Sequence, residues 1–179
     1  YSWSGTCRAK AVVCAFGLSR AMSSTLSQQT GYRPPSRLQT VVSKVHPGGL
    51  DPIPGLLNDD IHVLLPPFAN VEFAALIPKG NHVTIIVAGR NVTSREVEQC
   101  LQLPSVQSLL SCDPKPEDYF KGTFPIGLAH RPFGDRYVTL GDSAGLVRPF
   151  KGKGVNSAII TGHLAAMTML RHGVGREAF

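Results

Sequence analysis

The residues best suited to chemistry lie close together near the carboxyl end of the chain, from Gly141 to Asn156. Asp142 follows a short apolar run, which places a carboxylate at the carboxyl end of a predicted strand, where open α/β sheets bind ligands. Such a carboxylate can accept hydrogen bonds from sugar-like hydroxyl groups. Gly152 and Gly154 leave backbone N–H groups free at a predicted helix start, where the helix dipole favours negative charge. The pattern favours a polyhydroxylated, partly anionic ligand.

A P-loop for nucleoside triphosphates is the main alternative, since Gly152-Lys153 resembles the end of one. That motif needs four residues between its glycines and a Ser or Thr after the lysine. Here six residues separate Gly145 from Gly152, and Gly154 follows Lys153. The P-loop is therefore excluded, whereas a plain strand, loop and helix without a ligand stays open.

Three elements must position these residues: a strand over 136–140, a glycine-rich loop over 141–153 and a helix over 154–170. The helical segment contains no Asp, Glu, Lys or Arg, which predicts a helix that is buried on all sides. A membrane span is the alternative, but a span needs about 20 mainly apolar residues. This segment is shorter and includes polar residues, so the sequence favours a buried helix.

The amino-terminal and middle parts of the chain differ in pattern. An apolar run over 11–17 predicts a strand buried on both faces, as in a parallel sheet, and a short helix is predicted within 18–29. Lys79-Gly80-Asn81 predicts a hairpin turn. Four strand-like runs that end at Pro or Gly indicate a largely antiparallel sheet, namely 40–46, 61–65, 71–77 and 83–88.

The region after this sheet is predicted to be partly helical. Thr93 is the expected N-cap of a helix that Pro104 interrupts, and further apolar residues predict one or two more helical turns. The segment 123–127 is expected to form a short edge strand, because Pro125 cannot donate a hydrogen bond within a central ladder.

The composition indicates a globular protein, with 42% hydrophobic and 17% charged residues among 179. The net charge is +6, but the basic residues are spread along the chain, so no nucleic-acid partner is predicted and a basic binding module stays as an alternative. The four cysteines form no CxxC pair and have no histidine at zinc spacing, which predicts free thiols and no metal site. Free thiols and the lack of a visible signal peptide favour a cytoplasmic location without an integral membrane segment, and peripheral membrane association stays open.

The segment from Gly141 to Gly145, together with Pro149, Gly152, Gly154 and Ala158, closely resembles the second flavin-binding motif of FAD-dependent oxidoreductases. The resemblance is to the para-hydroxybenzoate hydroxylase and geranylgeranyl reductase type. It implies that Asp142 contacts the ribityl chain and that the N–H groups of residues 155 and 156 face the flavin pyrimidine edge. The cofactor-binding residues implied by the resemblance are Gly141, Asp142, Ser143, Pro149, Gly152, Lys153, Gly154, Val155 and Asn156.

The resemblance extends over most of the chain. Residues 16–20, Phe-Gly-Leu-Ser-Arg, look like the middle segment of that family, with phenylalanine in place of the family's aspartate. Residues 73–79 look like the aromatic strand of the reductase branch. No GxGxxG follows a predicted strand, so the resemblance implies a carboxyl-proximal portion of a larger flavoprotein, with the N-terminal half that holds the ADP part of FAD missing.

The expected fold is therefore mixed α/β, with part of a Rossmann-like FAD-binding domain and a largely antiparallel substrate domain. The FAD-binding part comprises residues 1–30 and 131–179, and the substrate domain comprises residues 37–130. The resemblance implies a flavin-dependent monooxygenase or reductase that acts on a hydrophobic or aromatic small molecule held against the antiparallel sheet, with NAD(P)H as a further candidate partner. No catalytic acid or base is assigned. A non-catalytic remnant or fragment that cannot bind FAD alone is the alternative.

Overall fold

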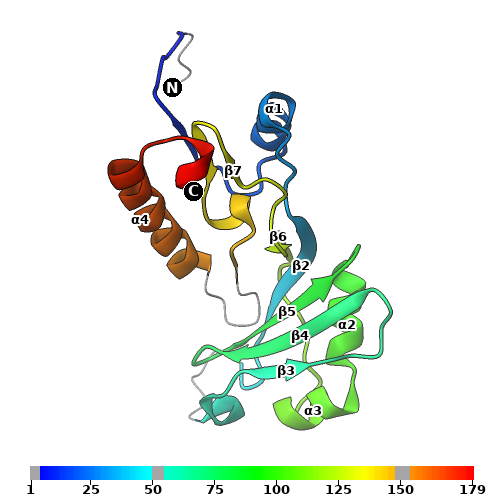
Figure 1. The fold of residues 1–179 in the computed structure, drawn as a ribbon. Helices are drawn as coiled ribbons and strands as arrows, with labels where there is room; N and C mark the ends of the chain where they lie inside the picture. Colours follow the sequence, from blue (N-terminus) through cyan, green and yellow to red (C-terminus); the bar gives the residue numbers. More distant parts are fainter. Residues whose placement is uncertain (1–4, 50–54, 148–153) are drawn as a thin grey trace. The chain divides into compact units, whose positions relative to one another are not determined.

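The computed structural model describes residues 5–49, 55–147 and 154–179. The chain separates into two compact units, one formed by residues 1–37 with 124–179 and the other by residues 38–123. Figure 1 shows that the first unit joins the two ends of the sequence, drawn in blue and red.

The first unit contains a three-stranded sheet in the order β1 (Val12–Cys14), β8 (Tyr137–Thr139) and β7 (Phe133–Gly134). β1 was predicted to lie in a parallel sheet and pairs in parallel with β8, while β7 and β8 are antiparallel. In its described residues this unit also contains two α-helices, α1 (Arg20–Thr30) and α4 (Gly154–His172), and two 3-10 turns, η2 (Gly141–Ala144) and η4 (Arg176–Ala178).

The predicted burial of β1 and α4 is wrong for the described chain. The side chains of Val12 and Val13 are 56% and 50% exposed, and on α4 only Ala165 is buried. The lack of charged residues makes the surface of α4 apolar, but burial also requires a neighbour on every side. Among the described residues α4 packs one side against η2 and η4, and its other side has no cover. Its exposed large apolar residues are Val155, Ile159, Ile160, Leu164 and Leu170.

The second unit is built on a five-stranded sheet in the order β3-β4-β5-β2-β6. The registers of β2 with β5, β3 with β4 and β4 with β5 are antiparallel, which confirms the predicted sheet. β6 occupies an edge of this sheet, as Pro125 predicts, and is longer than expected. The strand bounds are β2 (Ser36–Val45), β3 (His62–Leu64), β4 (Val71–Pro78), β5 (Val83–Gly89) and β6 (Phe120–Ile126).

The predicted hairpin turn and the predicted break between two helices are both confirmed in this unit. The β4–β5 hairpin turns at Gly80, whose φ of +75° lies in the left-handed region, and the Lys79 N–H donates to the His82 carbonyl over 2.8 Å. Helices α2 (Ser94–Leu101) and α3 (Pro104–Leu110) are separated at Pro104, as predicted. A 3-10 turn, η1 (Leu56–Asp59), precedes β3.

One face of this sheet forms the core of the second unit with η1, α2 and α3. Paired residues share a face, so Val41 with Val87 and Val45 with Val83 point toward the helices, and all four are fully buried. The helices contribute residues such as Val97 and Leu101 to the same cluster. The opposite face carries the alternate residues of each strand.

No helix in the described ranges has both the length and the hydropathy needed to cross a bilayer, and this includes α4.

Thr93 is the N-cap of α2, as predicted, and it forms a capping box with Glu96. The Thr93 N–H and hydroxyl both donate to Glu96 Oε2 over 2.7 Å, and Asn70 Nδ2 donates to Glu96 Oε1 over 3.0 Å. Burial raises the pKa of Glu96, but the hydrogen bonds from Thr93 and Asn70 outweigh it and lower this pKa from 4.5 to about 2. The ionised carboxylate is therefore the stabilising form.

Replacing Glu96 with Gln is expected to lower the free energy of unfolding by about 1 kcal/mol at pH 7, because the charge-assisted cap is weakened. Since the folded-state pKa is depressed, this contribution is present above about pH 4.5 and is lost as the pH falls toward 2. Urea unfolding at pH 7 and pH 3 measures it. The exposed Glu72→Gln is the control, and an equal loss at both pH values for Glu96→Gln would contradict the expectation.

Candidate functional site

The turn that follows β8 brings Asp142 and the start of α4 together. Gly141 has a φ of +56°, and its N–H donates to Thr161 Oγ1 of α4 over 3.3 Å. A Cβ at Gly141 would lie 3.1 Å from the Cβ of Ala158, so a larger residue would push the helix away from the strand end. Glycine at this position therefore sets how closely α4 approaches the turn.

Gly145 closes the same turn under a stronger constraint. Its φ is +76°, and a Cβ there would collide with the carbonyl oxygen of Gly127. Both glycines thus make room for protein atoms, Ala158 in one case and a backbone carbonyl in the other. They shape the site by letting neighbouring segments pack closely.

The side chain of Ser143 points into the protein. It is fully buried, and its hydroxyl lies 2.7 Å from the carbonyl oxygens of both Cys14 and Leu140. The fully buried Tyr32 donates its hydroxyl to the Ser143 carbonyl over 2.7 Å. Ser143 therefore ties β1 to the turn after β8, and this is a structural role.

The carboxylate of Asp142 lies beside the first residue of α4. A Cβ built on Gly154 would be 3.8 Å from Asp142 Oδ1. Asp142 is partly exposed, and none of the hydrogen bonds or ion pairs between described residues uses its carboxylate. Its oxygens are thus available as acceptors next to a helix N-terminus.

The start of α4 is open to solvent and carries no acidic residue in its first turn. Val155 is 73% exposed, and Asn156 is also exposed. The first N–H groups of a helix have no partner within the helix, and the helix dipole concentrates positive potential there. This end of α4 can therefore donate hydrogen bonds to an anionic group.

Of the residues predicted from the resemblance, the structure brings Gly141, Asp142 and Gly154 together at the mouth of α4, where Val155 and Asn156 follow. Pro149, Gly152 and Lys153 lie outside the described residues.

Two residues that support the site were not singled out from the sequence. Thr161 lies two helical turns after Gly154 and accepts from Gly141, but a threonine inside an apolar helix carries no local signal of this contact. Tyr32 precedes Arg33-Pro34-Pro35, a segment that reads as a simple break. Contacts between residues more than 100 positions apart, such as Tyr32 with Ser143, leave no trace in a single sequence.

A cavity of about 450 Å³ opens beside this turn. Asp142 is not among its lining residues, which come instead from the residues after β6, from the end of the turn and the residues that follow it, and from the first two turns of α4. They include Gly127, Leu128, Gly145, Val147, Ser157 and Thr161. In the described part of the chain no three His, Cys, Asp or Glu side chains converge in a metal-binding arrangement.

Comparison with known proteins shows the fold. No protein-family model matches the sequence, and no curated protein does. The flavin-dependent halogenase CmlS matches with a TM-score of 0.64 and 20% identity over 94% of this chain and 32% of its own. A triple mutant of the flavin-dependent brominase Bmp2 matches with a TM-score of 0.65 and 14% identity over 96% of this chain and 46% of its own. The Pseudomonas aeruginosa protein pqsL, a probable FAD-dependent monooxygenase, matches with a TM-score of 0.56 and 18% identity over 94% and 48%.

The chain is thus similar in fold to part of these structures and spans about a third to a half of their length. The shared architecture is mixed α/β with a large antiparallel sheet, which confirms the predicted fold class.

Replacing Ser143 with Ala is expected to lower the free energy of unfolding by roughly 1–3 kcal/mol, because buried carbonyl groups lose their hydroxyl donor. Urea unfolding measures the loss. Ser24→Ala is the matched control, since Ser24 lies exposed on α1. Equal stability of the two variants would show that the tie between β1 and the turn contributes nothing.

Proposed function

We propose that this chain is the part of a flavin-dependent oxidoreductase that binds the ribityl and isoalloxazine portions of FAD. The observation that carries the proposal is the position of the Asp142 carboxylate beside Gly154, at the mouth of α4. There the Asp142 carboxylate, a hydrogen-bond acceptor, lies next to the backbone N–H donors at the start of α4. Ribityl hydroxyl groups match the acceptor, and the pyrimidine edge of a flavin matches the N–H groups of Val155 and Asn156.

A bound flavin would supply the two-electron chemistry, and the chain would supply binding, orientation and electrostatics. Asp142 would fix the ribityl chain by accepting hydrogen bonds from its hydroxyl groups. The start of α4 would favour negative charge at the adjacent edge by about 0.3–1 kcal/mol, and by more where water is excluded. The packing of Gly141 against Ala158 holds these two groups at a set spacing.

We further propose that a hydrophobic or aromatic small molecule binds on the sheet face of the second unit that points away from α2 and α3. The register places Val42 opposite Ile86 and Ala75 opposite Ile86 on this face. Val42 and Ile86 are partly exposed, while Phe73 and Ala75 on the same face are buried. Such a surface favours an apolar substrate, with NAD(P)H as the candidate source of electrons. The two reaction types proposed for this substrate are oxygenation and reduction.

The ADP half of FAD is proposed to be held by a further polypeptide segment. Two observations support this: the uncovered apolar side of α4 with the half-exposed Val12 and Val13, and the much greater length of the similar structures. Parallel sheets are normally covered on both faces. A further segment that packs on β1 and α4 would cover their exposed apolar side chains. The same observations support a second candidate function. In this alternative the chain is a non-catalytic fragment that cannot retain FAD by itself.

Riboflavin tests the proposed site directly, because it contains the ribityl and isoalloxazine groups without the ADP half. Titration of the 179-residue chain is expected to quench riboflavin fluorescence saturably. Asp142→Ala is expected to weaken binding about tenfold or more, through loss of one charged acceptor worth about 1.4 kcal/mol. Asp135→Ala removes an exposed carboxylate of the same unit and serves as the control. Equal affinities of the Asp142→Ala and unaltered chains would overturn the flavin site.

Amide hydrogen exchange tests the proposed further segment. Val12 donates its N–H to the Arg136 carbonyl over 2.9 Å, so the Val13 N–H points to the other edge of β1. No strand of the described residues pairs with that edge. The Val13 amide is expected to exchange rapidly in the 179-residue chain. In a longer protein that includes the flanking coding sequence, its exchange should slow at least a hundredfold, while that of Val12 changes little. Rapid exchange of Val13 in both proteins would argue against strand addition at β1.

A further inference from the structure

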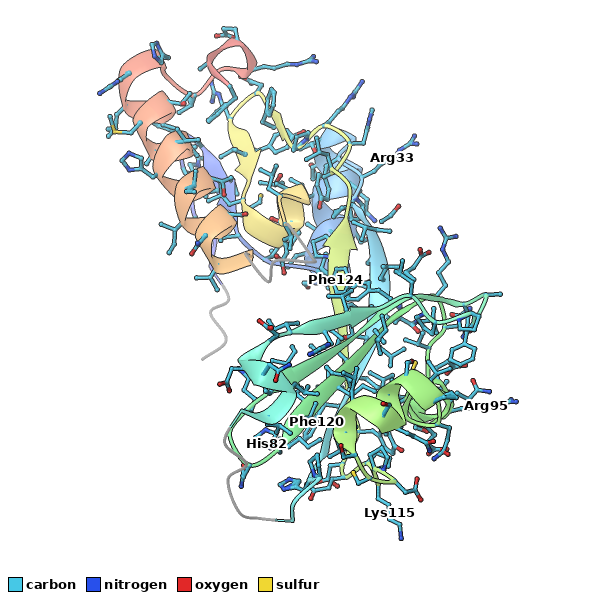
Figure 2. The ribbon with its side chains drawn as sticks, turned by 90° about the horizontal axis from the view of Figure 1, so that it is seen from below. Arg33, His82, Arg95, Lys115, Phe120 and Phe124 are labelled. Carbon is cyan, nitrogen blue, oxygen red and sulfur yellow. The ribbon has the colours of Figure 1, made fainter. Side chains whose placement is uncertain are left out.

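Two histidine side chains lie in contact where β2 ends and β5 begins. The ring centroids of His46 and His82 are 5.5 Å apart and the ring planes are inclined by 21°, so the two imidazoles are stacked. Val45 pairs with Val83 at the last antiparallel position of these strands, and the histidines are the next residues outward. His82, labelled in Figure 2, follows the turn at Gly80 that joins β4 to β5. The stacked pair therefore joins the tip of this hairpin to the end of β2.

The Glu117 carboxylate lies beside the His46 ring, with Oε1 3.4 Å from His46 Nε2. The backbone of Glu117 is fastened to β2, because its N–H donates to the Lys44 carbonyl over 2.9 Å. The hydroxyl of the fully buried Ser43 donates to the Glu117 carbonyl over 3.3 Å. The other ring nitrogen of His46, Nδ1, is 3.3 Å from the Gly49 carbonyl oxygen. The His46 ring thus lies between two acceptors, and in its protonated form it can donate to both.

His82 has mainly positive neighbours. The charged groups that face it are the ammonium groups of Lys44 on β2 and Lys79 in the hairpin, the His46 ring and, with the opposite sign, the Glu117 carboxylate. Partial burial and the positive neighbours lower the pKa of His82 below its usual 6.5, whereas Glu117 acts in the opposite direction. The neutral His82 ring is therefore the form that suits the stacked pair.

The hairpin tip is the part of this arrangement that can move. Its residues are bonded to one another, with the Lys79 N–H donating to the His82 carbonyl over 2.8 Å and the Asn81 N–H to the Lys79 carbonyl over 3.0 Å. Lys79 and Gly80 are exposed, and a Cβ at Gly80 would meet no other described segment within 4 Å. Exposed segments with few contacts open at a low free energy, so a modest repulsion is enough to displace the tip.

We propose that His46, His82 and Glu117 form a pH-sensitive clasp, in which a proton on His82 releases the β4–β5 hairpin tip from the end of β2. With His82 neutral, the rings stack and the tip stays closed. A proton on His82 adds positive charge beside Lys44, Lys79 and the His46 ring, so the stacked arrangement loses stability. Because the pKa of His82 in the closed tip is below 6.5, the contribution of the clasp is present above pH 6.5 and is lost as the pH falls below it. The proposal does not depend on flavin binding.

The test follows the 179-residue chain by NMR between pH 7.5 and pH 5, a range in which ordinary carboxylates stay ionised. The His82 ring is expected to titrate below pH 6.5, and the amide shifts of residues 79–83 should follow the same curve. The protection of the Lys79 amide against hydrogen exchange, corrected for the intrinsic rate, is expected to fall by about threefold or more. The amide of Val87, in the middle of β5, should keep its protection.

Three substitutions separate the members of the clasp. His82→Gln removes the titrating ring and is expected to make the protection of the Lys79 amide independent of pH over this range. His46→Gln removes a positive neighbour, so His82 should titrate at a higher pH. Glu117→Gln removes the negative neighbour, so His82 should titrate at a lower pH. His163→Gln is the matched control, because His163 lies exposed on α4.

A His82 ring that titrates at or above pH 6.5 in the unaltered chain would overturn the proposal, and this measurement does not require any variant to fold. An unchanged protection of the Lys79 amide at pH 5 would also overturn it. So would a fall in protection that is as large in the His82→Gln chain as in the unaltered chain, or one that His163→Gln abolishes.

Discussion

The close approach of α4 to the turn after β8 is the contact on which the candidate site depends. Gly141 permits it, because any side chain there would meet Ala158 within 3.1 Å. The Gly141 N–H then binds Thr161, and the helix starts with Gly154 beside the Asp142 carboxylate. The absence of a side chain at Gly141 therefore sets the distance between α4 and the turn. This distance determines whether the Asp142 carboxylate and the N–H groups at the start of α4 can bind the same ligand.

The turn itself is held from the opposite side by buried hydrogen bonds. Ser143 binds the carbonyl of Cys14 in β1, and Tyr32 binds the carbonyl of Ser143. Both side chains are fully buried, so water does not compete for these bonds. The parallel pair of β1 and β8 and the segment after α1 are thereby fastened to one turn. The rigidity of the candidate site thus comes from side chains that point into the protein.

The two units differ in how completely their apolar surfaces are covered. In the second unit the helices α2 and α3 close one face of the sheet, and its core residues are almost entirely buried. In the first unit, α4 and β1 leave large aliphatic side chains in solvent. A surface of that kind is costly in water at about 25 cal/mol per Å² of apolar area. This difference, together with the partial coverage of the similar structures, favours a further segment that packs on the first unit alone.

The sequence by itself determined the local elements: the hairpin at Gly80, the N-cap at Thr93, the break at Pro104 and the edge position of the strand with Pro125. Each depends on the backbone preferences of a few adjacent residues, which a single sequence displays directly. Only the tertiary structure decided what surrounds them. It left α4 half uncovered, turned Ser143 inward and stacked His46 on His82, because burial and contact depend on partners far away along the chain. The composition of a helix shows which surface would gain from being covered, and the fold alone shows whether another segment covers it.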